Sequence, residues 1–194
     1  MERGRLMRIA ALLLLIALAG CSKFRSYDGP EVTRVVVFKE ERRMYLMHGN
    51  RALAGYDIEM GFTPDGHKLY AGDGRTPEGR YTIDRRNPDS RFHLSLGIDY
   101  PNAADVARAR ASGKDPGGNI FIHGTPKGKA LRADWTWGCI AVSNREMEDI
   151  YAMVANGTVI DIYATAKAVR APAPEERRAR VEEAIADAAS TLVP

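Results

Sequence analysis

The sequence predicts a β-rich mixed α/β domain with a few short helices and a C-terminal helical tail. Residues 32–60 contain three runs rich in β-branched and aromatic side chains, separated by turn residues. Residues 92–100 alternate apolar and polar side chains, as a half-buried strand does. Helical patterns in the body of the chain are short and lie at 101–112 and 143–153. Together these patterns indicate a core built from strands.

The first three strands form a meander. Residues 32–38 are β-branched and predict the first strand, and residues 43–48 follow a charged turn as its hairpin partner. Residues 53–60 predict the third strand. A meander of this kind favours an antiparallel β domain.

Loops and short strands occupy the middle of the chain. Residues 61–79 are rich in Gly, Pro and Asp and predict a long loop, after which 80–83 is a short strand and 85–90 a polar turn. In the strand at 92–100 the even-numbered residues are apolar and the odd-numbered ones polar. Residues 119–122 predict another short strand, which ends at His123.

The second helix has a clear beginning. Ser143 and Glu146 have the spacing of a capping box, and Met147, Ile150 and Tyr151 form an apolar stripe. Residues 158–163 then predict a closing strand, so that the domain spans 32–165. Residues 166–194 predict a Pro-containing linker and an exposed helix.

The N-terminus predicts export from the cytoplasm. Residues 1–20 combine three arginines with an apolar run and small residues, which is typical of a signal peptide. The ending Leu18-Ala19-Gly20-Cys21 resembles the lipobox of bacterial lipoproteins, and this resemblance implies cleavage before Cys21 and its lipidation. Residues 21–31 would then tether the domain to a membrane in the periplasm, and Ser22 favours the outer membrane. A plain secretory signal is the alternative.

Composition excludes several classes of function. The chain has 194 residues, 45% of them hydrophobic, and a formal net charge of +3, much of it in the signal peptide. The near-neutral body gives no basis for nucleic-acid binding. Two cysteines exclude a disulfide-dense scaffold and a four-cysteine zinc site. If Cys21 is lipidated, Cys139 has no partner within the chain, and a lone thiol in an oxidising compartment needs burial or a function.

His123 and Cys139 are the candidate chemical groups. A thiol reacts as the thiolate, so a nucleophilic cysteine needs a base, and an imidazole titrates near neutral pH. Both residues lie next to a glycine at the predicted ends of elements: Gly124 follows the histidine and Gly138 precedes the cysteine. A lone His and a lone Cys are more often core residues, and that alternative stays open on spacing alone.

The segment from Ile122 to Ile140 resembles the catalytic signature of the L,D-transpeptidases: His-Gly, about fifteen residues, then Ser/Thr-any-Gly-Cys. Residues 76–83 resemble the upstream Thr-Pro-any-Gly-aromatic segment of the same family. This resemblance implies a β-rich, sandwich-like catalytic domain. Papain-like enzymes place the cysteine before the histidine, so the order here argues against them.

The resemblance also implies roles for these residues. Cys139 would be the nucleophile and His123 the general base, oriented by the carbonyl of Gly124. Thr136 would take the Ser/Thr place beside the nucleophile. Amides near Trp137, Gly138 and Cys139 would form the oxyanion hole.

The chain departs from the family pattern in two places. Trp137 stands where many members have His, and Ala141 stands where many have Arg. Loss of that cation puts substrate specificity in doubt, and Arg132, Asn144 or Arg145 could replace it.

The implied reaction transfers a peptidoglycan stem tetrapeptide, through a thioester on Cys139, to an amine. Hydrolysis at the same site, as an L,D-carboxypeptidase or an amidase, and a non-catalytic wall-binding lipoprotein are the alternatives. The partners would be stem peptides and, through the lipid, a membrane; no metal or organic cofactor is needed. The sequence does not indicate an oligomeric state.

His48 and His67 are predicted to lie on the surface, and His93 to be solvated or to border the groove. Trp135 and Trp137 are expected to face opposite sides.

Overall fold

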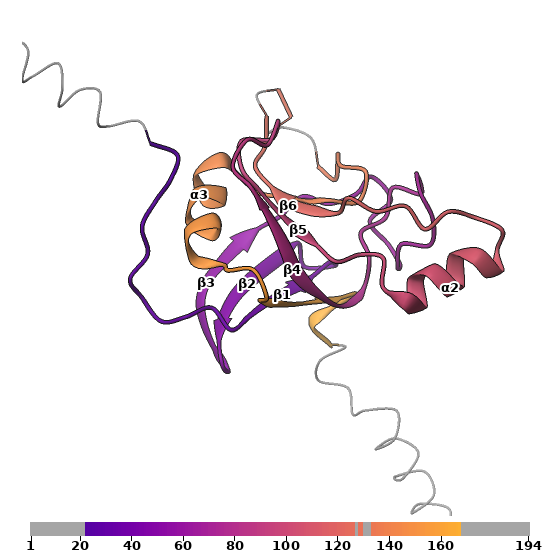
Figure 1. The fold of residues 1–194 in the computed structure, drawn as a ribbon, viewed down its shortest axis with the longest axis horizontal. Helices are drawn as coiled ribbons and strands as arrows, with labels where there is room; N and C mark the ends of the chain where they lie inside the picture. Colours follow the sequence, from indigo (N-terminus) through magenta and orange to yellow (C-terminus); the bar gives the residue numbers. More distant parts are fainter. Residues whose placement is uncertain (1–21, 127, 130–132, 168–194) are drawn as a thin grey trace, which may run out of the picture.

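The computed structural model describes residues 22–126, 128–129 and 133–167 (Figure 1). Strands dominate this part of the chain, which also contains two helices. In chain order the elements are β1 (Arg34–Phe38), β2 (Arg43–His48), β3 (Arg51–Asp57), β4 (Gly79–Asn87), β5 (Ser95–Ile98), α2 (Ala103–Ala111), β6 (Phe121–His123), β7 (Ile140–Ala141), α3 (Asn144–Met153) and β8 (Val159–Tyr163).

The strands form one mixed sheet in the order β3-β2-β1-β8-β4-β5-β6-β7. The closing strand β8 inserts between β1 and β4 and runs parallel to β1, and β6 and β7 are also parallel. The β-rich class is therefore confirmed, but the expectation of an antiparallel domain was wrong. Local sequence predicts that a segment forms a strand. Which strands lie beside it depends on where the closing strand β8 enters the sheet.

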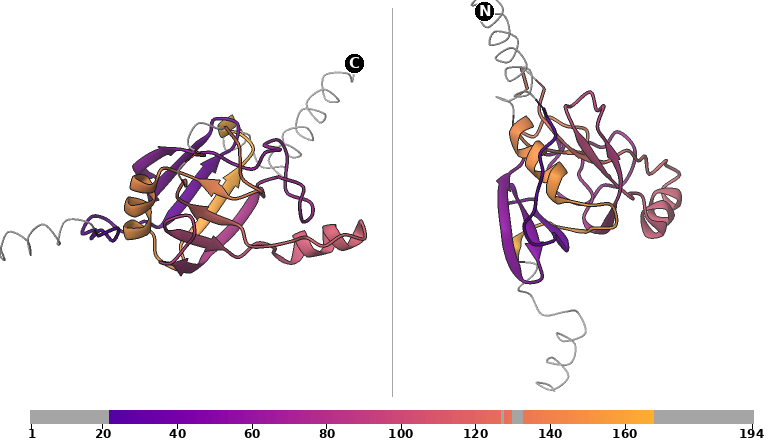
Figure 2. Two further views of the ribbon diagram at one scale, coloured as in Figure 1. Left: turned by 90° about the horizontal axis from the view of Figure 1, so that it is seen from above. Right: turned by 60° about the vertical axis from the view of Figure 1, so that its left-hand side comes forward.

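The sheet curls until its two ends meet. The segment after β3 forms bridges with the other end, through Glu59 to Ala141 and Gly61 to Thr136. The helices lie at opposite ends of the curled sheet, as Figures 1 and 2 show. A single cluster of buried apolar side chains fills the interior. The curl brings the segment from β3 to β4 against the turn that leads into β7.

Several elements agree with the sequence. The hairpin strand β2 has the predicted bounds, and β1 and β8 lie within their predicted ranges. Helix α3 begins after Ser143, where both hydrogen bonds of the capping box with Glu146 are present, and it buries the predicted stripe. Helix α2 is capped in the same way by Asn102 and Asp105. Local sequence patterns were sufficient to predict an element wherever its own capping residues and apolar side chains determine it.

Two predictions were wrong, and one side chain has surroundings that the sequence did not indicate, because contacts distant in sequence decide all three. Strand β4 ends at Asn87 and therefore continues into the polar turn predicted at 85–90. Here the Arg86 guanidinium bonds the Tyr151 carbonyl and lies 3.9 Å from its ring centre. Strand β5 is buried along its whole length, because it lies between β4 and β6. Lys39, predicted in a charged turn, is buried and bonds the carbonyl of Thr76 and the Glu78 carboxylate.

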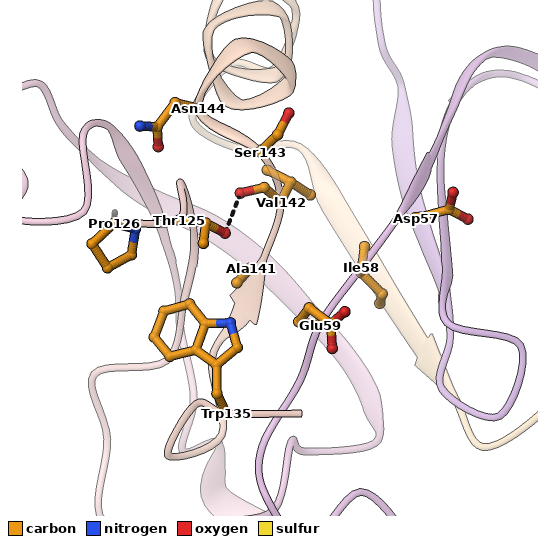
Figure 3. Close-up of a pocket in the computed structure, with 10 residues that line it drawn as sticks. All are labelled: Asp57, Ile58, Glu59, Thr125, Pro126, Trp135, Ala141, Val142, Ser143 and Asn144. Atoms are coloured by element: carbon orange, nitrogen blue, oxygen red, sulfur yellow. Dashed lines mark hydrogen bonds between the residues drawn. The ribbon is translucent and has the colours of Figure 1, made fainter. Parts of the chain in front are cut away.

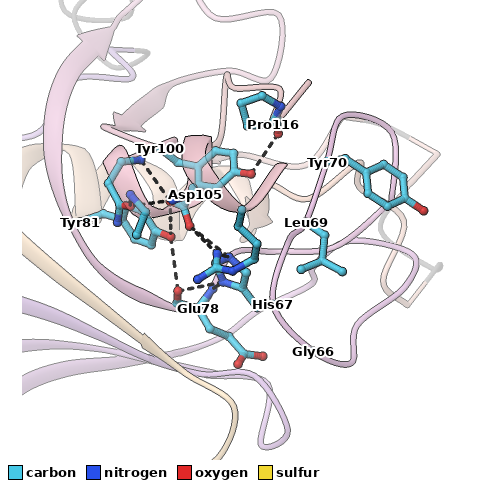
Figure 4. A network of polar contacts seen from close by, with 12 residues as sticks. Gly66, His67, Leu69, Tyr70, Glu78, Tyr81, Tyr100, Asp105 and Pro116 are labelled. Carbon is cyan, nitrogen blue, oxygen red and sulfur yellow. Dashed lines mark hydrogen bonds and ion pairs between the residues drawn. The ribbon is translucent and has the colours of Figure 1, made fainter. Parts of the chain in front are cut away.

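A polar network fixes α2 and the loop at 61–78 to β4 (Figure 4). The buried Asp105 carboxylate accepts the hydroxyl of Tyr81 at 3.0 Å and pairs with Arg108 and His67, each at 3.0 Å. His67 also contacts the backbone of Glu78. The prediction that His67 is a surface residue was therefore wrong: it holds the loop in place.

Residues 22–31 run beside α3. Arg25 pairs with Glu148 and Asp149, and Phe24 packs near Tyr151. In the described part of the chain, neither helix combines the length and apolar character that crossing a bilayer requires. The predicted signal peptide, Cys21 and nearly all of the predicted tail lie outside the described residues.

Candidate active site

Strands β6 and β7 bring His123 and Cys139 to one cavity of about 330 Å³. The parallel register sets His123 beside Ala141, and Cys139 lies two residues before Ala141. Residues paired across two strands point to the same face, so His123 and Ala141 share a face, and Cys139 immediately precedes β7. Two residues of chain and one step across the strand pair separate the Cα atoms of His123 and Cys139 by roughly 8 Å. Both side chains line the cavity.

The His123 ring is buried and held in one orientation. Its Nδ1 lies 2.7 Å from the carbonyl oxygen of Gly124, and Phe92 stacks on the ring with 4.5 Å between centroids. Burial lowers the pKa of His123 below its ordinary value, against the opposing effect of the bond to Gly124. The ring is therefore neutral near pH 7. Nδ1–H donates to Gly124, which leaves Nε2 as the basic nitrogen.

Gly124 is required by its surroundings. A Cβ there would lie 2.3 Å from Oδ1 of Asn144 and 2.8 Å from the carbonyl oxygen of Phe92. A larger residue would therefore displace the strand end that carries the orienting carbonyl. The predicted contact between His123 and Gly124 depends on this close packing.

Cys139 is present as a partly exposed free thiol. Its sulfur donates to the carbonyl of Asn119 at 3.6 Å. Burial raises the pKa of the thiol, and the Phe121 N–H and the charge of Lys68 offset this only in part. The resting site thus holds a neutral thiol and a neutral imidazole, and the nucleophile must lose its proton during the reaction.

The side chain of Thr136 stabilises the turn before Cys139 through two hydrogen bonds. The Oγ1 of Thr136, which is buried, donates to the carbonyl of Cys139 at 2.7 Å and accepts the N–H of Gly138 at 3.1 Å. Gly138 has φ 118°, and a Cβ there would lie 2.4 Å from the carbonyl oxygen of Arg75. Only glycine satisfies both conditions, so this turn fixes where the sulfur stands.

The loop at 61–78 packs against the turn before Cys139. Lys68 and Asp73 form a buried ion pair at 2.8 Å. Burial opposes ionisation of Asp73, yet bonds from Lys68 and three backbone amides together hold its pKa below its ordinary value. Thr76 is fully buried and accepts the N–H of Gly61. The Thr-Pro segment is therefore part of the support of the nucleophile.

Comparison with known proteins decides the family. Residues 32–162 match the family model YkuD, the L,D-transpeptidase catalytic domain. The chain belongs to this L,D-transpeptidase family.

Several known proteins resemble the chain. The Escherichia coli K12 protein YafK, named for the same family, is 29% identical over 176 residues, covering 79% of this chain and 66% of YafK. The Campylobacter jejuni helical cell shape determining protein Pgp2 has a TM-score of 0.56 at 26% identity, covering 72% of this chain and 50% of Pgp2. Bdellovibrio bacteriovorus Bd1075 shares the fold, with a TM-score of 0.52 at 21% identity, covering 84% of this chain and 58% of that one. The chain thus spans one half to two thirds of the length of these relatives.

The two departures from the L,D-transpeptidase pattern lie in different settings. Trp137 is 70% exposed and packs edge-on against Phe62, with 4.9 Å between centroids. Trp135 instead packs beside His123 at 5.7 Å, so the two tryptophans do have different surroundings. Ala141 is fully buried between β6 and Glu59. An arginine at 141 would need space that this packing does not leave.

The structure also places residues that the sequence did not indicate. Arg91, Asn119 and Ser95 line the cavity of Cys139, and Arg91 is the cationic side chain among its lining residues. No motif marks Arg91. It lines the cavity because β4 extends to Asn87 and the chain then turns back toward β5. His93 points elsewhere, to Glu148 at 2.9 Å. Asn144 lines another cavity, Arg145 is exposed, and Arg132 lies outside the described residues.

Proposed function

We propose that this chain is a peptidoglycan L,D-transpeptidase that forms a thioester with a stem tetrapeptide and transfers it to an amine. The observation that carries the proposal is the cavity shared by Cys139 and His123, with the imidazole fixed so that Nε2 is basic. Membership of the family supports the substrate class.

The first half-reaction begins from a neutral pair. His123 Nε2 takes the thiol proton as Cys139 attacks the carbonyl carbon at the L-centre of the third residue of the stem. The bond to the terminal D-residue breaks, and the same proton leaves with its amine. The thioester of Cys139 remains.

The oxyanion requires backbone donors. The Gly138 N–H is already bonded to Thr136, so the amides of Trp137 and Cys139 are the proposed donors. Thr136 holds the carbonyl of Cys139 and therefore positions the residue without touching the substrate. An anchor for a substrate carboxylate is proposed at Arg91, in place of the arginine missing at position 141.

The second half-reaction decides the product. An amine that attacks the thioester gives a cross-link or an exchanged peptide, whereas water gives a shortened stem or releases a wall-linked protein. We favour the amine, because residues 32–162 match the L,D-transpeptidase catalytic domain.

We also propose that the enzyme is a periplasmic lipoprotein. The predicted lipidation of Cys21 would anchor the domain to the envelope membrane, with the outer membrane favoured, and residues 22–31 would carry it toward the wall. Labelling cells with an alkyne fatty acid should tag the protein and leave Cys21→Ser untagged. Equal tagging of both would contradict the anchor.

The test uses residues 22–194, which omit only the predicted signal peptide and Cys21. Incubation with disaccharide tetrapeptides should add a tripeptide adduct to the intact mass, and mass spectrometry of the muropeptides should show its transfer. Cys139→Ala should give no adduct. The matched control is Asn50→Ala, an exposed residue in the turn between β2 and β3 that does not line the cavity.

The proposal fails if Cys139→Ala forms the same products, or if the wild-type protein binds tetrapeptides without any adduct or turnover. The latter result would favour a wall-binding module. A shortened stem with no amine transfer would assign the site to hydrolysis.

A further inference from the structure

The loop from Pro88 to His93, between β4 and β5, forms part of the wall of the cysteine cavity and is called the 88–93 loop below. Four of its residues line that cavity: Asp89, Ser90, Arg91 and Phe92. Phe92 is also the residue that stacks on the imidazole of His123. The position of this loop therefore determines both the shape of the cavity and the cover of the catalytic ring.

The backbone of the 88–93 loop does little to hold its own position. In the described part of the chain, residues 88–91 take part in no backbone-to-backbone hydrogen bond. His93 has φ 75°, which is rare for a residue with a side chain, and the Leu94 N–H bonds the Phe92 carbonyl across it at 3.0 Å. A strained turn of this kind persists only where surrounding contacts hold it. The loop thus depends on contacts from other segments.

Lys23 supplies one of these contacts and reaches both ends of the loop. Its Nζ donates to the carbonyl of Pro88 at 2.5 Å and to the carbonyl of His93 at 3.4 Å. Lys23 is half-buried, and hydrogen bonds from a charged donor are stronger than those between neutral groups. One ammonium group thus joins the first and the last residue of the 88–93 loop.

A second contact holds the side chain of His93. A carboxylate only accepts, so His93 Nε2 donates to Glu148 of α3, at 2.9 Å, and the other oxygen of Glu148 accepts from Arg25. Burial opposes ionisation of Glu148, but the bonds from Arg25 and His93 together hold its pKa below its ordinary value. The segment 22–31 therefore acts on His93 twice, directly through Lys23 and indirectly through Arg25.

Helix α3 is in turn joined to the strand end that carries the base. Figure 3 shows the hydroxyl of Thr125, two residues after β6, donating to the carbonyl of Val142 just before α3, at 2.7 Å. The Gly124 N–H donates to the Phe92 carbonyl at 3.0 Å. The 88–93 loop, α3 and the end of β6 thus form one connected support, and Lys23 is bound to it at the loop.

We propose that Lys23 is a positioning residue for the reaction: it clamps the 88–93 loop so that Phe92 stays stacked on His123. The inference rests on the proposed function, and it assigns to Lys23 a role that acts through the loop without contact to the substrate. Lys23 lies two residues after Cys21, the predicted site of lipidation. The segment that joins the domain to its anchor is therefore also part of the support of the active site.

The first measurement is the rate of thioester formation with disaccharide tetrapeptides, in the protein of residues 22–194. Lys23→Gln should lower this rate by about tenfold, because a misplacement of about 1 Å can cost up to about 10²-fold. Lys23→Arg keeps a charged donor and should recover most of the rate. Arg25→Gln should cost about twofold at most, since its pair with Glu148 is exposed. Arg51→Gln, which is exposed on β3, is the control for the loss of one positive charge.

The second measurement reports the cover of His123 without any substrate. The chain has four histidines, and His123→Ala and His67→Ala assign two of the imidazole signals in a ¹H–¹³C spectrum. The Phe92 ring, with 4.5 Å between centroids, should shift the His123 signals through its ring current. Lys23→Gln should move them toward the position of an exposed histidine, and Lys23→Arg should not. The His67 signals, from the network at Asp105, should stay in place and show that the fold is intact.

The two measurements separate the possible outcomes. The inference is overturned if Lys23→Gln leaves the His123 signals in place, if it moves them while the thioester forms at the wild-type rate, or if Arg51→Gln lowers the rate as much. Failure of the proposed function has another signature: no thioester in the wild type, with the His123 signals still moved by Lys23→Gln, would refute the proposed function and leave the clamp standing. A wild-type thioester together with unchanged signals and rate in Lys23→Gln would refute the clamp alone.

Discussion

Replacing Thr136 by valine tests whether the turn before Cys139 is held by one hydroxyl. The two side chains have nearly the same shape, but valine leaves the Cys139 carbonyl and the Gly138 N–H without their partner. Thr136 is 3% exposed, so water does not readily replace it. Each buried polar group left unpaired costs about 1–3 kcal/mol, which gives a loss of about 2–6 kcal/mol for the pair.

The loss should appear in both stability and activity. For a domain of this size, 1 kcal/mol lowers Tm by about 2–4 °C, so the Tm of Thr136→Val should fall by about 4–24 °C. Alkylation of Cys139 in the folded state should change as well, because the sulfur is no longer fixed. Thr136→Ser keeps the oxygen and should recover most of both properties. If valine unfolds within about 1 °C of the wild type while serine does not differ from it, the hydroxyl does not brace the turn and the argument is refuted.

Four further predictions follow from the same geometry. His123→Ala should lower acyl transfer by about 10²-fold or more with an unchanged circular dichroism spectrum, since it removes the proposed base; unchanged turnover would show that the base is another group. Because burial raises the pKa of Cys139, iodoacetamide labelling should be slow at pH 7 and climb with pH beyond the range of an ordinary thiol; a rate that is flat from pH 6 to 8 would indicate a preformed thiolate. Arg91→Gln should raise KM for donors with a free carboxylate and leave kcat nearly unchanged, whereas an amidated donor should not respond. Gly138→Ala should lower Tm and activity together, since its Cβ meets the Arg75 carbonyl at 2.4 Å; wild-type values would contradict the close approach.

Local sequence predicted elements whose determinants are local. The capping box at Ser143 and Glu146 and the buried stripe of α3 require nothing from the rest of the chain. The β-branched run of β1 likewise predicts a strand whatever its neighbours are. Elements of this kind account for the correct fold class.

The errors share a physical cause. Arg86 continues a strand because its guanidinium finds the Tyr151 carbonyl and ring, 65 residues away. Lys39 is buried because the carbonyls of the loop at 61–78 surround its ammonium, and burial lowers its pKa against the opposing charge of Glu78. Charged side chains are assigned to the surface by default, and only tertiary contacts reveal the exceptions.

The candidate site divides in the same way. Its chemical pair was visible as a motif, because nucleophile, base and their glycines have fixed spacing in the chain. The groups that shape the cavities were not visible, since Arg91, Glu59 and Trp135 come from three separate segments. No spacing rule connects them until the sheet curls and joins Glu59 to Ala141.

That junction also explains why the missing arginine at position 141 need not mean a lost function. Ala141 forms the bridge to Glu59, so a small residue there keeps the sheet ends together. The buried packing between β6 and Glu59 leaves no space for an arginine side chain at this position. Arg91 lines the cavity of Cys139 and His123 and supplies a positive charge there. Position 141 therefore joins the two ends of the sheet, and we propose that Arg91 takes over the recognition of a substrate carboxylate.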